Sequence, residues 1–310
     1  MLRPMDLWRS AIIRRPALGV LREPVLPEPV LPEEVVWLPP MPPRAFRADP
    51  FGLWRDGRLY VFAETFDYFE RRGCIEVLVY DRDLTLIEPP RTVLRRPFHL
   101  SYPVVFEAEG EIWMLPEAFA SGTLTLYRAR HFPDAWEPVC DLPLDGPAID
   151  ATPVRHEGRW WLFYSPSQPK SARRSHLHLA WAPRLTGPWT LHPANPVRID
   201  PASARPGGTV LRDEAGGLLL PVQDCRATYG HAIRALRIDR LDEAGFAATP
   251  GPALRPTGWM APHTDGLHTL SAAGDVTLID VKHMDASLSG TLGRLAGIAV
   301  ARVGLRVRGA

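Results

Sequence analysis

The stretch that decides the fold is ADPFGLWRDGRLYVFAE, residues 48–64, because a similar stretch, SYPVVFEAEGEIWMLPE, returns at residues 101–117. A third copy, DATPVRHEGRWWLFYS, covers residues 150–165, and two weaker copies cover residues 204–224 and 263–283. Each copy has a polar residue, a short apolar strand, a turn with glycine and a second strand rich in aromatic and branched residues. This pattern is typical of a β-hairpin, so the chain is predicted to repeat one unit five times.

The spacing of the copies indicates the architecture. Their turn glycines recur at intervals of about 50 residues, which suits a four-stranded propeller blade. A third β-like run follows each hairpin, starting near residues 73, 122, 175, 230 and 293, and short outer strands are expected around Trp136 and Trp189. We therefore expect an all-β fold: a five-bladed β-propeller with four-stranded blades around a central funnel, occupying residues 46–310 as one domain.

The N-terminal residues 1–45 are expected to close the ring and then to wrap over the surface. The stretch LWRSAIIRR, residues 7–15, can add a strand to the last blade and so cover an open sheet edge. Nine prolines lie between Pro16 and Pro43, which excludes an interior strand or a long helix there.

The composition indicates which partners and which cellular compartment to expect. With 36 Lys and Arg against 35 Asp and Glu, the net charge of +1 gives no reason to expect a nucleic acid or an anionic membrane as partner. The three cysteines share no metal-ligand spacing and are odd in number, so a reducing compartment is expected. No run of about eighteen apolar residues predicts an integral membrane segment. We expect a cytoplasmic protein.

The candidate site follows from the repeat. In a propeller the residues at the start of each innermost strand rim one mouth of the channel. These rim positions carry Asp49, Tyr102, Asp150, Arg205 and Asp265, and the ends of the second strands add Glu64, Glu117, Gln223, Asp224, Lys282 and His283. Several acids converging on one funnel form the arrangement that glycoside hydrolysis needs, one carboxyl neutral as acid and one charged as base or nucleophile.

Several motifs, in order along residues 6–238, carry a resemblance to a known family: ADPF, HLSYPVVFE, MLPE, LYRARHFPDAW, GPWTLHPANP and QDCRATYG. They resemble the N-terminal propeller domain of plant glucosamine inositolphosphorylceramide transferase and its bacterial relatives. That domain is similar to the five-bladed clan of arabinanases, xylosidases, invertases and levansucrases. In the plant protein the transferase chemistry is attributed to a separate C-terminal domain, so the resemblance does not carry that activity over.

The clan's catalytic residues match this sequence at two positions and fail at a third. The resemblance implies that Asp49 is the base or nucleophile and that Asp150 is the carboxylate that orients and tunes the acid. Where the clan places a Glu as general acid, this sequence has Arg205 in SARPGG. An arginine stays protonated and cannot deliver a proton. Either Glu117 or Asp224 takes that role, or the chain is not a hydrolase of the clan type.

Arg205 itself has two readings. Its planar guanidinium can clamp a carboxylate or phosphate, which predicts an acidic or phosphate-linked sugar as ligand. Alternatively, it only neutralises Asp150 and Asp49 across the channel, because buried acids demand a counter-charge.

The remaining candidates are weaker. His99 and Tyr102 are expected to hydrogen-bond sugar hydroxyls or, for Tyr102, to anchor a strand start, and Glu64 occupies in blade one the place of Glu117. Trp54 and Phe66 are the expected sugar platforms. His263 and Asp265 open the fifth copy and join the expected binding residues. Lone histidines are usually structural, so we expect no metal and no cofactor.

The leading hypothesis is a carbohydrate-active propeller that binds a sugar or glycolipid, with Asp49, Asp150, Glu117 and Asp224 as catalytic candidates for hydrolysis or glycosyl transfer. The alternative is a non-catalytic glycan-binding or scaffolding module that works beside a separate glycosyltransferase. A funnel in which Arg205 is locked in salt bridges favours the alternative.

Overall fold

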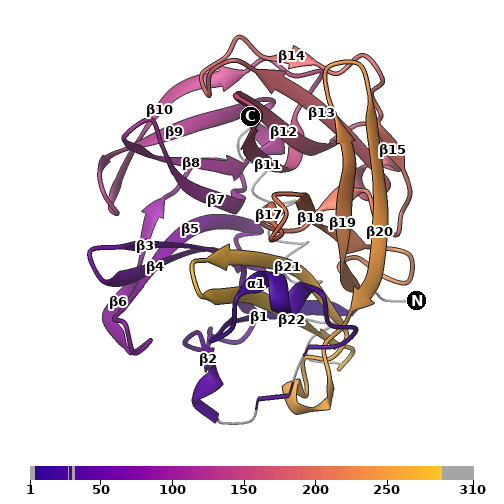
Figure 1. Ribbon diagram of the computed structural model, residues 1–310. Coiled ribbons are helices and arrows are strands. Elements are labelled where there is room, and N and C mark those ends of the chain that lie inside the picture. The colour runs from indigo at the N-terminus through magenta and orange to yellow at the C-terminus, as the bar shows by residue number, and fades with distance from the viewer. Residues whose placement is uncertain (1–3, 27, 30–31, 288–310) are drawn as a thin grey trace, which may run out of the picture.

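The described chain forms a ring of five antiparallel sheets (Figure 1). The computed structural model describes residues 4–26, 28–29 and 32–287. The first blade contains β3 (Ala45–Arg55), β4 (Arg58–Asp67), β5 (Arg72–Tyr80) and β6 (Leu86–Leu94), and the second contains β7 (Ser101–Ala108), β8 (Glu111–Glu117), β9 (Leu124–His131) and β10 (Ala135–Leu142). Neighbouring blades follow one another around the ring in chain order. This confirms the predicted five-bladed β-propeller.

The third and fourth blades depart slightly from four regular strands. The third contains β11 (Ala148–His156), β12 (Arg159–Pro166) and β13 (His176–Ala182), with β14 (Thr190–Leu191) and β15 (Arg198–Ile199) both paired to β13. In the fourth, β16 (Arg205–Pro206) and β17 (Leu211–Arg212) share the innermost position against β18 (Leu218–Asp224), followed by β19 (Ala232–Leu241) and β20 (Phe246–Leu254). The break between β16 and β17 falls at Gly207 and Gly208.

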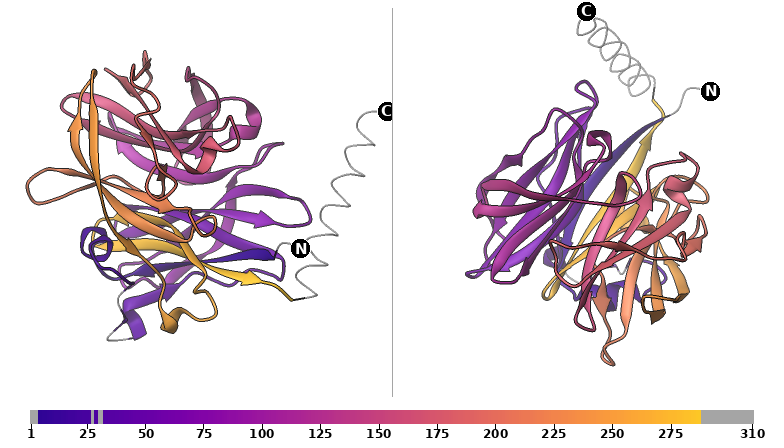
Figure 2. Two further views of the ribbon diagram at one scale, coloured as in Figure 1. Left: turned by 90° about the vertical axis from the view of Figure 1, so that its right-hand side faces the viewer. Right: turned by 90° about the horizontal axis from the view of Figure 1, so that it is seen from above.

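The fifth blade combines strands from the N-terminal and the C-terminal segments of the described chain. It contains β21 (Gly266–Ala273), β22 (Val276–Asp285), β1 (Met5–Ile13) and the outer strand β2 (Val35–Trp37). Strand β1 pairs antiparallel with β22 from Met5↔Asp285 to Ile13↔Thr277, and both views of Figure 2 show the two strands side by side. The predicted ring closure by an N-terminal strand is confirmed. The strand expected near Gly293 lies outside the described residues, and β1 holds the third position of this blade.

Short helices complete the described elements. The α-helix α1 (Ala17–Leu21) follows β1, and single turns of 3₁₀ helix lie at Pro32–Glu34, Phe119–Ser121, Ala172–Arg174 and Gly258–Met260. Within the residues that the structure describes, no helix is long and apolar enough to cross a membrane.

Tight turns explain why the hairpins repeat. The turn pairs Asp56–Gly57, Glu109–Gly110 and Glu157–Gly158 all have positive φ at both residues. This is the type I′ geometry, whose twist matches that of the two strands it joins. Glycine at the second position is favoured because it has no Cβ to oppose a positive φ. In the first three blades the repeated glycine is therefore the second residue of the turn that joins the two inner strands.

The innermost strands of the first three blades share a bulge that aims one residue at the ring axis. Asp49, Tyr102 and Asp150 have φ of 49°, 45° and 49°, and the pairing register shifts beside each of them. A non-glycine residue in this left-handed region is uncommon and costs free energy. The same unusual conformation three times indicates that local contacts stabilise it, and these contacts lie in the funnel.

Tyr102 fills the channel on the axis. Its hydroxyl accepts a hydrogen bond from the Gly208 amide at 2.6 Å and lies 2.9 Å from Thr152 Oγ1, while its ring meets Phe51 edge-on at 4.8 Å. A side chain at Gly208 would collide with the Leu270 carbonyl. Glycine there lets the fourth blade approach β21 of the fifth blade closely, and Tyr102 ties blades two, three and four together.

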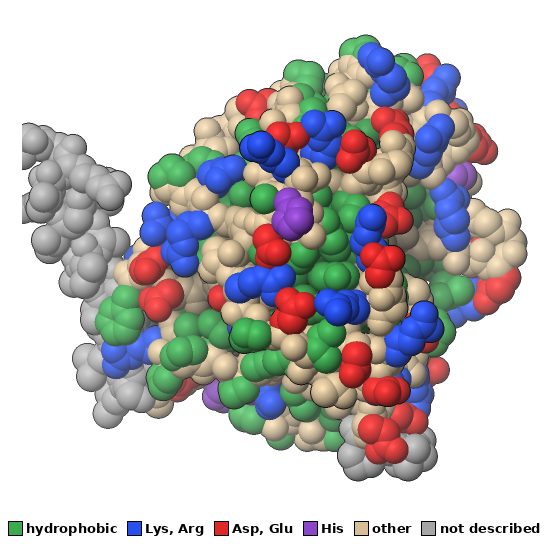
Figure 3. All heavy atoms as spheres, turned by 90° about the vertical axis from the view of Figure 1, so that its left-hand side faces the viewer, with side chains coloured by type: hydrophobic (Ala, Val, Ile, Leu, Met, Phe, Trp, Pro, Cys, Tyr) green, Lys and Arg blue, Asp and Glu red, His purple; other side chains and the backbone are tan. Residues whose placement is uncertain are grey.

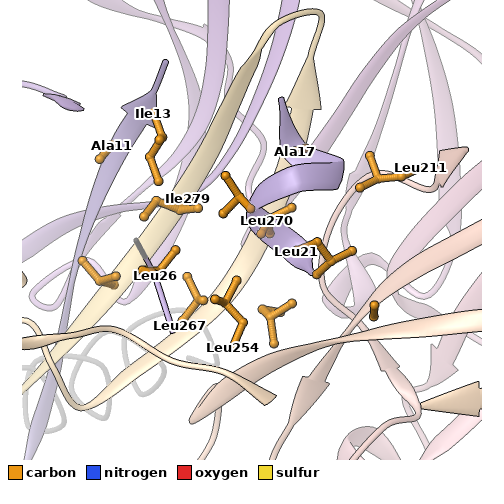
Figure 4. Close-up of a cluster of buried hydrophobic side chains, with 14 of the residues drawn as sticks. Ala11, Ile13, Ala17, Leu21, Leu26, Leu211, Leu254, Leu267, Leu270 and Ile279 are labelled. Atoms are coloured by element: carbon orange, nitrogen blue, oxygen red, sulfur yellow. The ribbon is translucent and has the colours of Figure 1, made fainter. Parts of the chain in front are cut away.

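The core is divided among the joints between blades. In the described chain, five large hydrophobic clusters each lie between two neighbouring blades. Figure 4 shows the cluster between blades four and five, where Ala17 and Leu21 of α1 pack over side chains from β1, β17, β20, β21 and β22. Helix α1 therefore covers the joint that the chain must close with its own N-terminal strand.

The outer surface carries both signs of charge. On the face drawn in Figure 3, Lys and Arg side chains are interspersed with Asp and Glu. Ion pairs near the outer edges of the blades include Arg91–Asp134 at 2.5 Å and Arg128–Glu137 at 2.6 Å. The near-zero net charge is thus also balanced locally on this face.

The Tyr102 hydroxyl is predicted to stabilise the ring. Tyr102→Phe leaves the buried Gly208 amide without its acceptor, so we expect the free energy of unfolding to fall by about 1–3 kcal/mol. Tyr80→Phe is the matched control, because the buried Tyr80 hydroxyl has no hydrogen-bond partner among the described residues and its removal is expected to be neutral or stabilising. Urea unfolding of both variants measures this. Equal effects of the two substitutions would contradict the assigned role of Tyr102.

Candidate functional site

A pocket of about 190 Å³ opens where the innermost strands begin. Every blade contributes to its wall, which is lined by Trp8, Phe46, Asp49, Glu64, Phe66, His99, Ser101, Glu117, Asp150, Arg205, Tyr229 and His268. Of the residues expected to be catalytic or to bind ligand, the structure brings Asp49, Glu64, Glu117, Asp150, Arg205 and His99 together here. The predicted convergence of acids on one funnel is therefore seen.

Three of the buried carboxylates join one blade to the next. The Asp49 amide donates to Asp280 Oδ2 at 2.8 Å, and the Tyr102 amide donates to Asp49 Oδ2 at 3.2 Å. The Asp150 amide donates to Glu117 Oε2 at 3.3 Å. Each donor is one of the residues with positive φ, so the carboxylates fix the left-handed residues of blades one, two and three. These acids have a structural role whether or not they also act on a ligand.

All three guanidinium nitrogens of Arg205 donate hydrogen bonds to the protein. Its Nε donates to Asp150 Oδ2 at 2.6 Å, Nη1 donates to the Arg173 carbonyl at 3.3 Å and Nη2 donates to the Tyr229 hydroxyl at 3.3 Å. The same Asp150 oxygen accepts a bond from Gln223 Nε2 at 2.8 Å. Each guanidinium nitrogen already donates a hydrogen bond, so the geometry favours the reading of Arg205 as counter-charge of Asp150 over that of an anion clamp.

His268 lies between two carboxylates. Its Nδ1 is 2.7 Å from Asp280 Oδ1 and its Nε2 is 3.4 Å from Asp49 Oδ1, while the Trp8 ring stacks on it at 3.8 Å between centroids. Asp49 Oδ1 also accepts a bond from Thr269 Oγ1 at 2.6 Å. Ligand atoms of Asp49, His268 and Asp280 lie within 4.8 Å of one another, a donor set able to hold a divalent cation. In the structure they hydrogen-bond to the protein.

Burial changes the protonation of the pocket. It raises the pKa of Asp49 to about 6, although His268 opposes the shift, and it raises the pKa values of Glu64 and Glu117 well above their usual range. Burial also lowers the pKa of His99 to about 4, so this imidazole is neutral near pH 7. Desolvation is the first cause in each case, because the charged form loses its water. The pocket thus combines neutral acids with a carboxylate that ionises near pH 6.

Glu64 and Ser101 differ from the other polar groups of the pocket. Glu64 is 5% exposed and Ser101 is 6% exposed, and within the described chain neither side chain has a hydrogen-bond partner. The His99 ring stands 3.5 Å from Glu64 Oε1, with its Nδ1 accepting a bond from the Gly73 amide. A side chain at Gly73 would collide with both Glu64 and His99, which explains glycine there. Their hydrogen-bonding capacity remains for a ligand.

Aromatic rings form the rest of the wall. Phe46 and Phe66 stack on each other at 5.1 Å, and Tyr229 stands edge-on to Trp8 at 6.2 Å. Phe66, one of the two expected platforms, therefore does line the pocket. Buried aromatic faces beside polar groups are the usual surroundings of a small ligand.

Asp224 lies outside the pocket because of strand alternation. On β18 the adjacent Gln223 faces Asp150, so Asp224 faces the opposite side, where Arg226 and Arg234 bind it at 2.7 and 3.0 Å. The hydrogen bonds to these arginines lower the pKa of Asp224 to about 2 against the effect of burial. A carboxylate held charged in this way cannot act as general acid, which leaves Glu117 as the candidate of the two.

Four other expected residues also lie away from the wall of the pocket. Trp54 donates its indole N–H to the Ala273 carbonyl and lines a separate hollow with Arg14 and Arg82. Tyr102 blocks the channel, as described above. His263 lines another hollow beside Arg9, and burial lowers its pKa to about 4.

Asp265 does not occupy the rim position of blade five. The bulge of β21 falls between Leu267 and Leu270, so His268 holds the place that Asp49 holds in blade one. Asp265 precedes it and accepts a bond from the Met284 amide. The fifth copy has fewer residues between its bulge and its turn glycine than the first copy, so its rim residue lies closer to the turn.

Sequence reasoning missed Trp8, Ser101, Tyr229, His268 and Asp280. Trp8 comes from the closing strand, which has no counterpart among the repeats, and Tyr229 comes from a loop. Ser101 directly precedes the bulge of β7, and Asp280 lies on β22 opposite the bulge of β21, so both positions follow from the strand register. These positions can be recognised only when the strand register is known. Weak repeats in a sequence do not define that register.

Comparisons with known proteins agree with this fold. The family model of the N-terminal part of glucosamine inositolphosphorylceramide transferase 1 matches residues 28–253. Proteins of that name from Oryza sativa subsp. indica and from Arabidopsis thaliana are each 35% identical to the chain, over 212 and 214 residues. The matches cover 67% and 68% of this chain and 28% of each relative. The chain thus matches less than a third of the length of these relatives.

Solved structures of similar fold include glycoside hydrolases. An α-L-arabinofuranosidase from Podospora anserina in complex with cellotriose superposes with a TM-score of 0.55 at 11% identity, covering 78% of this chain and 92% of that one. An α-L-arabinofuranosidase from Lactobacillus brevis has a TM-score of 0.52 at 19% identity, covering 74% and 80%. At such low identity they show the propeller fold alone. By the extent of the family match, the chain belongs to the family of the N-terminal part of glucosamine inositolphosphorylceramide transferase 1.

Proposed function

We propose that this propeller binds one sugar unit of a glycan or glycolipid in the funnel pocket, as a recognition module that works beside a glycosyltransferase. Family membership supports the carbohydrate context, because the relatives carry the name glucosamine inositolphosphorylceramide transferase 1. Since the match covers 28% of those relatives, the transferase activity itself is not assigned to this chain.

The proposal rests on one observation: some polar groups of the pocket bond to the protein, while others have no such bond within the described residues. Asp49, Glu117 and Asp150 are engaged in joints between blades, and Arg205 is engaged with Asp150. Glu64 and Ser101 are buried, face the same pocket and retain their hydrogen-bonding capacity for a ligand. Convergent polar groups beside aromatic faces suit a sugar ring, whose hydroxyls need hydrogen bonds and whose C–H faces pack on aromatic rings.

Glycoside hydrolysis is the second candidate, and the protonation pattern favours it. Asp49, with a pKa of about 6, is suited to act as base or nucleophile, while Glu117 and Glu64, whose pKa values are raised well above the usual range, are suited to donate a proton. Two carboxyl groups with separated pKa values are the requirement of that chemistry. Hydrolysis is the second candidate because Arg205, which cannot donate a proton, stands where the resemblance predicts the general acid of the clan.

The Ser101 hydroxyl is predicted to contact the bound sugar. Ser101→Ala removes no hydrogen bond within the described protein, so we expect an unchanged unfolding midpoint and about fivefold weaker binding, the effect of one neutral hydrogen bond. Saturation-transfer NMR with glucose, galactose, mannose, arabinose and glucosamine identifies a ligand, and calorimetry gives its affinity. If wild-type protein binds none of these sugars, or the variant binds as tightly, the assigned pocket is wrong.

Arg205 is predicted to act as the counter-charge of Asp150. Arg205→Met leaves Asp150 buried without its partner, so we expect the free energy of unfolding to fall by about 3–5 kcal/mol, and the double variant with Asp150→Asn to recover part of this. Arg58→Met, which breaks the exposed pair with Glu88, serves as control and is expected to cost less than about 1 kcal/mol. A fully stable Arg205→Met protein would instead favour the anion clamp.

The hydrolytic candidate predicts a specific pH profile. A base must be unprotonated, so the rate with aryl glycosides should rise with pH through about 6, where Asp49 ionises, and Asp49→Asn should remove the activity. A panel of 4-nitrophenyl glycosides assayed from pH 4 to pH 9 tests this. Absence of turnover by a wild-type protein that binds the sugar would discard hydrolysis and leave the recognition module.

A further inference from the structure

A second pocket, of about 330 Å³, lies where the fifth blade meets the segment that leads into the first. Its wall is formed by residues 7–10 of β1, by residues 38–44 between β2 and β3, by the start of β3 and by His263. We call it the wrap pocket, after the proline-rich segment that covers it. Trp8 is the one lining residue that it shares with the funnel pocket, so the two are separate sites with a common wall.

Most of the wall of the wrap pocket is apolar. Four prolines, at positions 39, 40, 42 and 43, line it together with Leu38 and Met41, and β1 contributes Leu7 and Trp8. Proline has no N–H and a fixed φ, so this segment offers a stiff apolar surface. A pocket of this size with mostly apolar walls suits a small molecule that has an apolar body.

The charged side chains of the wall are all cationic. Arg9, Arg44 and Arg47 line the pocket, and within the described chain no Asp or Glu does so. Arg47 is paired with Glu76 at 2.8 Å, whereas Arg9 and Arg44 have no acidic partner among the described residues. The wrap pocket is therefore the reverse of the funnel pocket, whose wall carries four carboxyl groups.

Aromatic rings support the two arginines that lack an acid. The guanidinium carbon of Arg9 lies 4.2 Å from the centroid of the Trp37 ring, and that of Arg44 lies 5.1 Å from the centroid of the Phe69 ring. A guanidinium that packs on a ring face keeps the N–H groups of its edge available to an oxyanion. Both side chains are therefore held in place before an anion arrives.

Buried polar atoms without partners gather at the same pocket, which is an independent sign of a ligand. Of the six buried side-chain nitrogen and oxygen atoms that lack a hydrogen-bond partner in the described chain, three belong to its wall: Arg9 Nε, Arg47 Nε and His263 Nδ1. Arg47 is only 4% exposed. Burying an N–H donor without an acceptor is unfavourable, so a ligand that supplies acceptors here would be stabilised.

The arginines supply the charge of the pocket. Burial, with Arg9 adding to its effect, lowers the pKa of His263 to about 4, so this imidazole is neutral near pH 7. It can still form a hydrogen bond through Nδ1 in either tautomer.

The donors and the apolar wall favour a carboxylate over a phosphate. A carboxylate has two oxygens, which match in number the two unpaired Nε–H groups, and it carries a single charge. A phosphate monoester carries nearly two charges at neutral pH. Because transfer of charge from water into apolar surroundings is costly, the singly charged group fits this wall better.

We propose that the wrap pocket binds a small carboxylic acid with an apolar body, whose carboxylate pairs with Arg9 and Arg44 and accepts a hydrogen bond from Arg47. The apolar body packs on the prolines and on Trp8. This site uses neither the carboxyl groups nor Ser101 of the funnel pocket, so the proposal stands independently of the proposed sugar site.

Four probes separate charge from apolar contact: 2-naphthoate, 2-naphthalenemethanol, 2-naphthyl phosphate and acetate. At pH 7 a carboxylic acid of ordinary pKa is ionised, so naphthoate combines one negative charge with the apolar rings. The alcohol lacks the charge, the phosphate carries more of it, and acetate lacks the rings. We expect calorimetry with the wild-type chain to show at least tenfold tighter binding of naphthoate than of each other probe.

Arg9→Met assigns the charge to this pocket. Methionine keeps an apolar side chain over Trp37, and the change breaks no hydrogen bond or ion pair of the described protein. We expect naphthoate affinity to fall at least tenfold and affinity for the alcohol to change less than threefold. Arg184→Met, which removes an exposed arginine from the loop after β13, is the matched control and should leave both affinities unchanged.

Each contrary outcome has a distinct meaning, and the comparison of probes on the wild-type chain does not depend on how a variant folds. Equal binding of naphthoate and the alcohol would overturn the anion site. Equal or tighter binding of naphthyl phosphate would overturn the choice of a carboxylate, and equal binding of acetate would overturn the role of the apolar wall. Binding of none of the probes would overturn the proposal and leave the sugar site untouched. An Arg9→Met protein with wild-type naphthoate affinity would show that the acid binds elsewhere.

Discussion

The ring depends on hydrogen bonds between buried carboxylates and the backbone of the adjacent blade. Asp280, Asp49 and Glu117 accept the amides of Asp49, Tyr102 and Asp150, respectively. Each of these donors has a positive φ and lies on the innermost strand of the next blade. Charged or polar acceptors for buried amides offset both the unusual backbone and the loss of water. The blades are therefore joined at the mouth by acids and farther out by hydrophobic clusters.

This construction concentrates acid at one end of the channel and determines where a ligand can bind. Tyr102 fills the axis below the mouth, so the remaining space is the pocket above it. Asp150 accepts hydrogen bonds from Arg205 and Gln223 of the fourth blade, so its charge is balanced within the protein.

The same pocket is also lined by groups that the joints between blades do not use. Glu64, Ser101 and Phe66 can contact a ligand without breaking a joint between blades, whereas a change at Asp49 or Asp150 alters both the fold and the site. This coupling explains why acidic residues at the mouth of a propeller are a poor guide to catalysis when considered alone. Their protonation and partners decide what they do.

The sequence by itself determined the five blades, the closing strand and the convergence of Asp49, Glu64, Glu117, Asp150 and Arg205, because hairpin turns and hydrophobic alternation are local properties repeated along the chain. Only the tertiary structure decided which residues face the pocket. Asp224 and Asp265 fall outside it and His268 and Trp8 inside, since a bulge shifts register by one residue and a strand places alternate side chains on opposite faces. The pairing of Arg205 with Asp150 likewise depends on blades that are 55 residues apart in sequence.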